Sequence, residues 1–245
     1  GAKPDGLNIN QECGATHAKT IQQAVKQYKA DIGIALDGDG DRLIMADNKG
    51  WLYDGDQLVC IIAKHRQNKN LLNGGVVGTL MTNLAIESCF KKLNIPFARA
   101  KVGDRYVLSL LQKKGWELGG EGSGHIICLD KHSTGDGIIS ALQVLHAMKD
   151  DNKTLAELLH DVVLYPQHLI NIKITKGFDF HAIKSVQAAQ IKAENDLGKK
   201  GRVLIRTSGT ELLVRVMVEG ESKQKVEHWA EYISKILRKE IRLEN

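Results

Sequence analysis

Short apolar segments alternate with amphipathic segments along most of this 245-residue chain, and this alternation restricts the fold more than any other feature. The stretches "DIGIALD", "GGVVGTL" and "PFARAKV" have the length and composition of buried strands. Helix patterns separate them, with expected helices at residues 16–30, 55–67, 82–93 and 104–114. Strands separated by such helices predict a parallel or mixed sheet that helices cover on both faces.

The pattern changes near Tyr165 and Pro166. The stretch "YPQHLINIKITKG" predicts an edge strand, followed by a long amphipathic helix over 180–197, two strands around a loop within 201–220, and a final helix from Ser222. This order indicates a separate small α+β domain. The predicted fold class is therefore α/β, with mixed sheets covered by helices, followed by a small α+β C-terminal domain.

Composition excludes several classes of protein. No apolar run is long enough to cross a bilayer, so we expect a cytoplasmic protein with no membrane partner. The four cysteines form no C-x-x-C pair, which argues against a disulfide framework or a cysteine-ligated zinc site. The net charge of +5 is spread along helices, so no nucleic-acid partner is expected, although a basic balance suits small anions.

The stretch "ALDGDGDRL" places Asp37, Asp39 and Asp41 at alternate positions directly behind an apolar strand. A tight loop with flexible glycines can turn all three carboxylates toward one point. Carboxylates held this close raise one another's pKa unless a cation compensates them. The pattern therefore predicts a divalent metal site, and ligands that are all oxygen favour Mg²⁺.

Three alternatives apply to this loop. A calcium EF-hand loop would need Gly where Arg42 stands and Glu where Asn48 stands, so it is excluded. A phosphatase with Asp37 or Asp39 as nucleophile is nearer, but Asp41 and Arg42 replace the small hydroxyl residue expected there. A plain polar turn would gain nothing from three neighbouring carboxylates.

Two further loops carry polar side chains between glycines. The stretch "AKVGDRYV" contains Lys101, Asp104 and Arg105, and Asp104 could simply cap the following helix. The stretch "GGEGSGHIICLD" alternates Glu121, Ser123 and His125 with glycines, as a site for a hydroxylated ligand requires. A histidine at the start of a strand could also be purely structural.

A fourth loop, "RTSGTELLVR", lies in the small domain. Its guanidinium, hydroxyls and free backbone N–H groups suit a phosphate dianion, although a glycine-containing hairpin turn is the alternative. The expected ligands are Arg206, Ser208, Gly209 and Thr210. A metal site and a phosphate site in one chain point to a phosphorylated substrate.

The motifs "DGDGDR", "GEGSGH" and "RTSGTE", in this order and at these separations, resemble the α-D-phosphohexomutase family across essentially the whole chain. The stretches "NINQECGATH", "VGTLMTNLAIE", "ARAKVGDRYV" and "STGDGIISALQVL" are similar to the bacterial branch that acts on glucosamine phosphates rather than to the phosphomannomutase or phosphoglucomutase branches. The chain departs from the family at Leu212, where Pro is usual, and at Gly122, where larger residues are common.

The resemblance implies an isomerase that interconverts glucosamine 6-phosphate and glucosamine 1-phosphate through a bisphosphorylated sugar and an activated phosphoserine. It implies that Asp37, Asp39 and Asp41 bind Mg²⁺ and that Arg42 stands beside the transferring phosphoryl group. The remaining assignments concern the phosphorylated amino sugar. The loop that faces the sugar would contain Lys101, Gly103, Asp104 and Arg105. The groups that bind its hydroxyls or amine would be Glu121 and Ser123, with His125 nearby. The non-reacting phosphate would be bound by Arg206, Ser208, Gly209 and Thr210.

The family's phosphoserine is followed by His-Asn-Pro, and no serine of this chain has that setting. We therefore expect residues 1–52 to be the end of domain two, 53–164 domain three and 165–245 domain four, with the N-terminal domains of the same enzyme as the missing partner. The chain alone is predicted to be inactive. The alternatives are a stand-alone phosphosugar-binding module without catalysis, or another phosphohexomutase.

Overall fold

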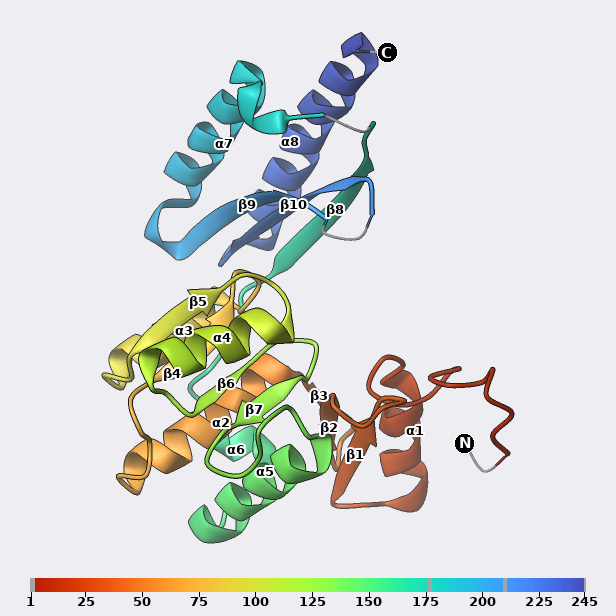
Figure 1. Cartoon of the computed structure of the whole chain (residues 1–245), viewed down its shortest axis with the longest axis vertical. Helices are drawn as coiled ribbons and strands as arrows, with labels where there is room; N and C mark the ends of the chain where they lie inside the picture. The colour runs from red at the N-terminus through yellow and green to blue at the C-terminus, as the bar shows by residue number, and fades with distance from the viewer. Residues whose placement is uncertain (1–2, 176–177, 209–210, 245) are drawn as a thin grey trace. The chain divides into compact units, whose positions relative to one another are not determined.

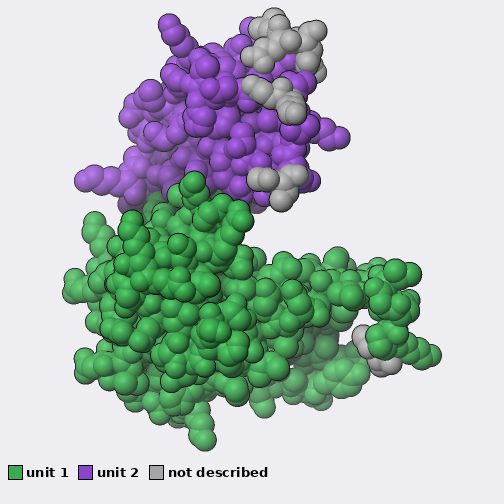
Figure 2. Space-filling view, viewed as in Figure 1, with its two compact units in different colours: residues 1–163 green, residues 164–245 purple. Residues whose placement is uncertain are grey.

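The computed structural model describes residues 3–175, 178–208 and 211–244. The chain forms two compact units, Gly1–Val163 and Leu164–Asn245, which Figure 2 shows in different colours. Unit 1 contains two sheets and unit 2 contains one, and each unit has its own hydrophobic core.

Unit 1 begins with a helix and a small antiparallel sheet of order β1-β2-β3 (Figure 1). These elements are α1 (Lys19–Tyr28), β1 (Ile32–Leu36), β2 (Leu43–Asp47) and β3 (Leu52–Tyr53). Ala18 occupies the N-cap of α1 without a side-chain cap, so the expectation that the helix starts at Thr16 is wrong. The Thr16 hydroxyl lies 3.4 Å from the ring of His17 instead of capping a backbone N–H.

The larger sheet of unit 1 has the order β5-β4-β6-β7. Its strands are β4 (Val76–Thr79), β5 (Phe97–Ala100), β6 (Leu118–Gly120) and β7 (Ile126–Cys128). Strand β4 pairs in parallel with β5 and β6, whereas β7 pairs with β6 antiparallel. The expectation of a mixed sheet is confirmed.

Helices cover this sheet on both faces, as Figure 1 shows for α4 and α2. The helices of this part are α2 (Gly55–Asn68), α3 (Leu84–Lys92), α4 (Asp104–Lys114), α5 (Gly137–Asp151) and α6 (Leu155–Leu158). Val107 and Leu111 of α4 pack on Val77 of β4 in a core that excludes water. All four residues of β4 are buried, in agreement with its apolar start at Val76 and Val77.

Unit 2 is an antiparallel sheet of order β8-β10-β9 with two long helices. Its elements are β8 (Gln167–Lys173), α7 (Lys184–Leu197), β9 (Gly201–Thr207), β10 (Leu213–Gly220) and α8 (Lys223–Glu244). Two short 3₁₀ turns, Phe180–Ala182 and Gly198–Lys200, flank α7. Val214 and Val216 of β10 and Trp229 of α8 belong to its core. The predicted α/β class with a small α+β C-terminal part is confirmed.

Among the described residues, no helix combines the length and the apolar character that crossing a bilayer requires.

Candidate functional site

The three aspartates lie in the loop that joins β1 to β2, directly after the last residue of β1. One carboxylate oxygen from each of Asp37, Asp39 and Asp41 lies within 4.8 Å of the others. Asp37 is buried, Asp41 is half-buried and Asp39 is exposed. The cluster therefore presents oxygen donors toward one point that solvent can reach, as a Mg²⁺ that keeps several waters requires.

The two glycines of this loop have different roles. Gly40 has φ of +75°, a conformation that an L side chain rarely adopts. Gly38 does not have positive φ, but a Cβ there would lie 2.2 Å from the side chain of Ile9. Backbone freedom therefore explains Gly40, and close packing explains Gly38.

Arg42 fixes the position of Asp37. Its backbone N–H donates to Oδ1 of Asp37 at 3.1 Å, and its Nε donates to Oδ2 at 2.5 Å. Burial would raise the pKa of Asp37, but these hydrogen bonds and the guanidinium charge outweigh burial and lower it below its ordinary value. Asp37 is thus held as a carboxylate, the form that binds metal.

His125 joins the aspartate loop to the "GEGSGH" loop. Its Nδ1 lies 2.9 Å from Oδ2 of Asp41, and since a carboxylate only accepts, the ring N–H donates this bond. Oδ1 of Asp41 and Nε2 of His125 are buried without a hydrogen-bond partner among the described residues, although Nε of Arg42 lies 3.7 Å from Oδ1 of Asp41. A buried carboxylate oxygen without a hydrogen bond, next to two other carboxylates, fits a site built for a cation.

Backbone contacts also hold these segments together. The N–H of Leu43, which follows the aspartate loop, donates to the carbonyl of Gly124 at 3.0 Å. The N–H of Gly137, the first residue of α5, donates to the carbonyl of Gly40 in the aspartate loop at 2.8 Å. A Cβ at Gly124 would lie 2.2 Å from the carbonyl oxygen of Leu43, so only glycine permits this approach. A Cβ at Gly135 would lie 2.2 Å from Nε2 of His125, so this glycine leaves the space that the ring occupies.

The "GEGSGH" loop also contacts the "KVGDR" loop. The N–H of Gly103 donates to Oε1 of Glu121 at 2.8 Å. Lys101, Asp104, Arg105 and Ser123 are exposed. The guanidinium of Arg105 and the ammonium of Lys101 lie 4.7 Å and 5.9 Å from the centre of the Tyr106 ring, which therefore carries two cations at this edge of the unit.

The structure puts Gly103, not Asp104, at the N-cap of α4, and Asp104 is the first helical residue. Gly103 has φ of +125°, so the chain enters the helix through a conformation that suits glycine. The Asp104 side chain is therefore not needed as a helix cap.

A buried acid beneath the "GEGSGH" loop was missed by the sequence analysis. Asp56, in the first turn of α2, accepts from the N–H of Asn83 at 2.8 Å. A Cβ added at Gly122 would lie 3.5 Å from its Oδ2. Burial, with the neighbouring charge of Asp54, raises the pKa of Asp56 to about 7. Nothing in "YDGDQL" distinguishes this buried aspartate from Asp54, which caps the helix.

In unit 2, Arg206 near the end of β9 lies directly opposite Arg215 of β10 in the antiparallel register. Like charges opposite each other destabilise a sheet unless an anion lies between them. Burial and the charge of Arg215 lower the pKa of Arg206, and Nε of Arg215 is buried without a hydrogen-bond partner among the described residues. Nη2 of Arg215 donates to Oε2 of Glu211 at 3.0 Å, and its unpartnered Nε makes Arg215 a second candidate anion ligand. In "LLVRVMVEG", the alternation of strand positions puts Arg215 on the less buried face, and this pattern could have indicated Arg215 as a ligand.

The remaining members of the predicted phosphate loop are only partly described. The N–H of Ser208 donates to the carbonyl of Leu213 at 2.8 Å, so that group closes the hairpin and is not free for a ligand. Gly209 and Thr210 lie outside the described residues.

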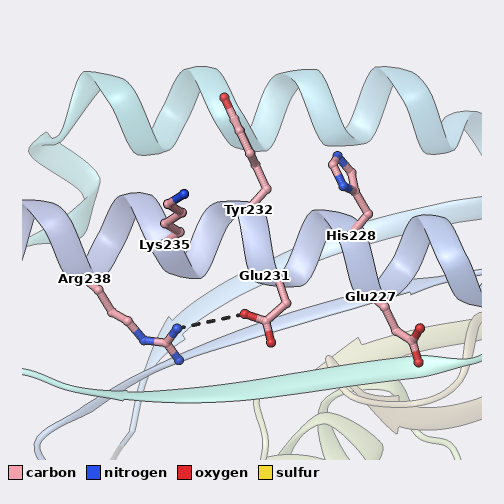
Figure 3. Close-up of a pocket in the computed structure, with 6 residues that line it drawn as sticks. All are labelled: Glu227, His228, Glu231, Tyr232, Lys235 and Arg238. Atoms are coloured by element: carbon pink, nitrogen blue, oxygen red, sulfur yellow. Dashed lines mark ion pairs between the residues drawn. The ribbon is translucent and has the colours of Figure 1, made fainter.

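A surface hollow elsewhere in unit 2 contains none of the predicted residues. It has a volume of about 480 Å³ and is lined by six residues of α8 (Figure 3), namely Glu227, His228, Glu231, Tyr232, Lys235 and Arg238. The dashed line in Figure 3 marks the ion pair between Arg238 and Glu231, at 3.9 Å. Along this exposed helix face two acidic side chains are followed by two basic ones, so the hollow lacks the convergent groups of a phosphosugar site.

Three models of one family match the chain in succession. Residues 3–50 match the alpha/beta/alpha domain II of phosphoglucomutase/phosphomannomutase, residues 54–165 match its alpha/beta/alpha domain III, and residues 169–236 match its C-terminal domain. The chain belongs to this phosphohexomutase family.

Within the family, the chain is similar to phosphoglucosamine mutases. It is 68% identical to the phosphoglucosamine mutase of Nitrosospira multiformis over 97% of this chain and 51% of that protein. It is 60% identical to that of Nitrosomonas eutropha over 95% of this chain and 51% of that protein. The chain thus spans about half the length of the curated relatives it matches.

A solved structure has the same fold. The N-acetylphosphoglucosamine mutase of Aspergillus fumigatus, crystallised with GlcNAc-6P and magnesium, superposes with a TM-score of 0.77. The match covers 96% of this chain and 58% of that protein at 24% identity.

Proposed function

We propose that this chain supplies the metal-binding, sugar-binding and phosphate-binding parts of a phosphoglucosamine mutase that acts in the cytoplasm. The enzyme would interconvert glucosamine 6-phosphate and glucosamine 1-phosphate through a bisphosphorylated sugar. The observation that carries the proposal is the hydrogen bond between His125 and Asp41. It joins the carboxylate cluster to the loop that the family resemblance assigns to the sugar.

The proposed division of the chain follows the family resemblance. Residues 1–52 would be the end of domain two, 53–164 domain three and 165–245 domain four. The matched ranges 3–50, 54–165 and 169–236 support this division, as does the separation of two compact units between Val163 and Leu164.

The carboxylates of Asp37, Asp39 and Asp41 would hold Mg²⁺. When bound, the ion neutralises charge that develops as a phosphoryl group is transferred. The chain's own residues set up this site. Arg42 keeps Asp37 ionised, and the buried ring of His125 holds Asp41 in place. The Arg42 side chain is 38% exposed, so it can also approach a phosphoryl oxygen.

Other groups would orient the substrate. Glu121 and Ser123 would bind sugar hydroxyls or the amine, with Glu121 fixed by the N–H of Gly103. Lys101, Asp104 and Arg105 would face the sugar from their exposed loop. Arg206, with Ser208, Gly209 and Thr210, would bind the phosphate that does not react, and Arg215 would share this role because it lies opposite Arg206.

A chimera tests the activity. The N-terminal half of the Nitrosospira multiformis relative is fused to this chain, and conversion of glucosamine 6-phosphate is measured with Mg²⁺. We expect sustained turnover by the chimera and none by the chain alone, since no serine here precedes His-Asn-Pro. The matched control is the Asp39→Ala chimera, which should be inactive.

The same assay separates the alternatives. Faster conversion of mannose 6-phosphate or glucose 6-phosphate would indicate another phosphohexomutase. A folded chimera that binds phosphosugar without turning it over would favour a binding module without catalysis. Turnover by the chain alone would contradict the proposal that the donor serine lies outside it.

A further inference from the structure

A second group of metal-ligating side chains lies on α2 and α5, on residues that the proposed mutase chemistry does not use. One donor atom from each of His65, His146 and Asp150 lies within 4.8 Å of the others. His65 is in the last turn of α2, whereas His146 and Asp150 are one turn apart on α5. Their spacing of four residues puts both side chains on the face that meets α2.

The burial of both ring nitrogens of His65 independently indicates a ligand. Its side chain is only 5% exposed, and both Nδ1 and Nε2 are buried without a hydrogen-bond partner among the described residues. A neutral imidazole always carries one N–H donor and one acceptor, so burying both without partners is unfavourable. A metal ion bound to one nitrogen would satisfy one of these two unpartnered groups.

The carboxylates around the ring match the arrangement of histidines that bind metals. Nε2 of His65 lies 3.7 Å from Oδ2 of Asp150, and Nδ1 lies 3.6 Å from Oδ1 of Asp151. A metal-binding histidine usually donates its second N–H to a carboxylate that fixes the ring. Asp151 is in position for this role, because a small movement would bring it into hydrogen-bonding distance.

We propose that His65, His146 and Asp150 bind a divalent transition-metal ion of the Zn²⁺ class, with Asp151 orienting the ring of His65. Two imidazoles and one carboxylate suit Zn²⁺ or Co²⁺ and do not suit Mg²⁺, which prefers oxygen. Donors bound to one tetrahedral ion lie about 3.4 Å apart, given bond lengths of about 2.1 Å. The exposed side chains of His146 and Asp150 can make the required movement. The ion would join the C-terminal ends of α2 and α5.

One cation competes for this site. Nζ of Lys69 lies 2.9 Å from Oδ2 of Asp150 and lowers the pKa of that aspartate by hydrogen bonding and charge. Its side chain is 43% exposed, so it can leave without opening the core. Removing Lys69 should therefore tighten metal binding. If the Lys69–Asp150 ion pair were the only role of this aspartate, removing Lys69 would not increase metal affinity.

The test is a titration of the full chain with Co²⁺ alone, followed by visible absorption. The chain carries Asp39→Ala so that the aspartate loop contributes no metal site. Four-coordinate Co²⁺ with imidazole ligands absorbs far more strongly than six-coordinate Co²⁺ with oxygen ligands, so the strong bands report this site. Zn²⁺ added afterwards should abolish them, because both ions suit the same donors.

Matched variants decide the assignment. His146→Ala and Asp150→Asn change exposed side chains and should keep the fold. Loss of an outer-shell partner lowers metal affinity at least roughly tenfold. Each of these variants removes a direct ligand and should lower Co²⁺ affinity by at least that factor. Lys69→Ala should bind more tightly, and His228→Ala, an exposed histidine of α8, should bind as the parent does. Absence of strong bands, or equal affinity in His146→Ala, would overturn the proposal. So would an NMR spectrum in which His65 carries protons on both nitrogens and does not respond to Co²⁺.

Discussion

Replacing Asp56 with Asn should change how the stability of unit 1 depends on pH. Burial, with the charge of Asp54, raises the pKa of Asp56 from 3.8 in the reference state to about 7 in the folded chain. Between these values the folded chain keeps a proton that the unfolded chain has lost. Because the unfolded state then binds fewer protons, the free energy of unfolding falls as the pH rises from about 4 to 7 and levels off above 7.

The size of the effect follows from the same two pKa values. A difference of this size corresponds to about 4 kcal/mol for a single group. Asparagine is neutral at every pH and can still accept the N–H of Asn83 through its side-chain oxygen, which Asp56 accepts now at 2.8 Å. Asp56→Asn should therefore be close to the parent in stability near pH 4 and more stable than the parent by up to about 4 kcal/mol above pH 7.

Urea unfolding at several pH values between 4 and 8 measures this difference. A Trp229→Phe background leaves the unit-1 tryptophans, Trp51 and Trp116, as the fluorescence probes. The control is Asp31→Asn, which removes an exposed aspartate and should run parallel to the parent. Parallel pH profiles for Asp56→Asn and the parent would refute the reasoning, since they would mean that Asp56 is ionised throughout this range.

Three other predictions concern the proposed ligands and the loop packing. Calorimetry should detect weak Mg²⁺ binding that disappears in Asp39→Ala, and unchanged binding there would put the ion elsewhere. Arg206→Ala should weaken glucosamine 6-phosphate binding roughly tenfold to a hundredfold, because a charge-assisted hydrogen bond contributes about 1.5–3 kcal/mol; an NMR titration that gives the parent's affinity would reject the phosphate assignment. Gly124→Ala should lower the urea midpoint of unit 1, since its Cβ would lie 2.2 Å from the carbonyl oxygen of Leu43, and an unchanged midpoint would mean that the loops separate at little cost.

Local patterns in the sequence determined most of the fold. The alternation of apolar and amphipathic segments predicted α2 and α4 to within one residue at each end, because strand and helix periodicities depend on near neighbours. The aspartate loop was predictable for the same reason, since Asp37, Asp39 and Asp41 occupy one short turn and need no distant element to bring them together.

Tertiary structure decided the contacts between segments that are far apart in the chain. The hydrogen bond between Asp41 and His125 joins residues 84 positions apart and depends on how the two loops pack. Strand register puts Arg215 opposite Arg206, and helix packing brings His65 to His146 and Asp150. Burial, which only the packed core sets, raises the pKa of Asp56, whereas the sequence around it shows only a polar helix start. Local periodicity determines whether a segment forms a helix or a strand. Which residues of different elements meet depends on side-chain packing across the whole unit.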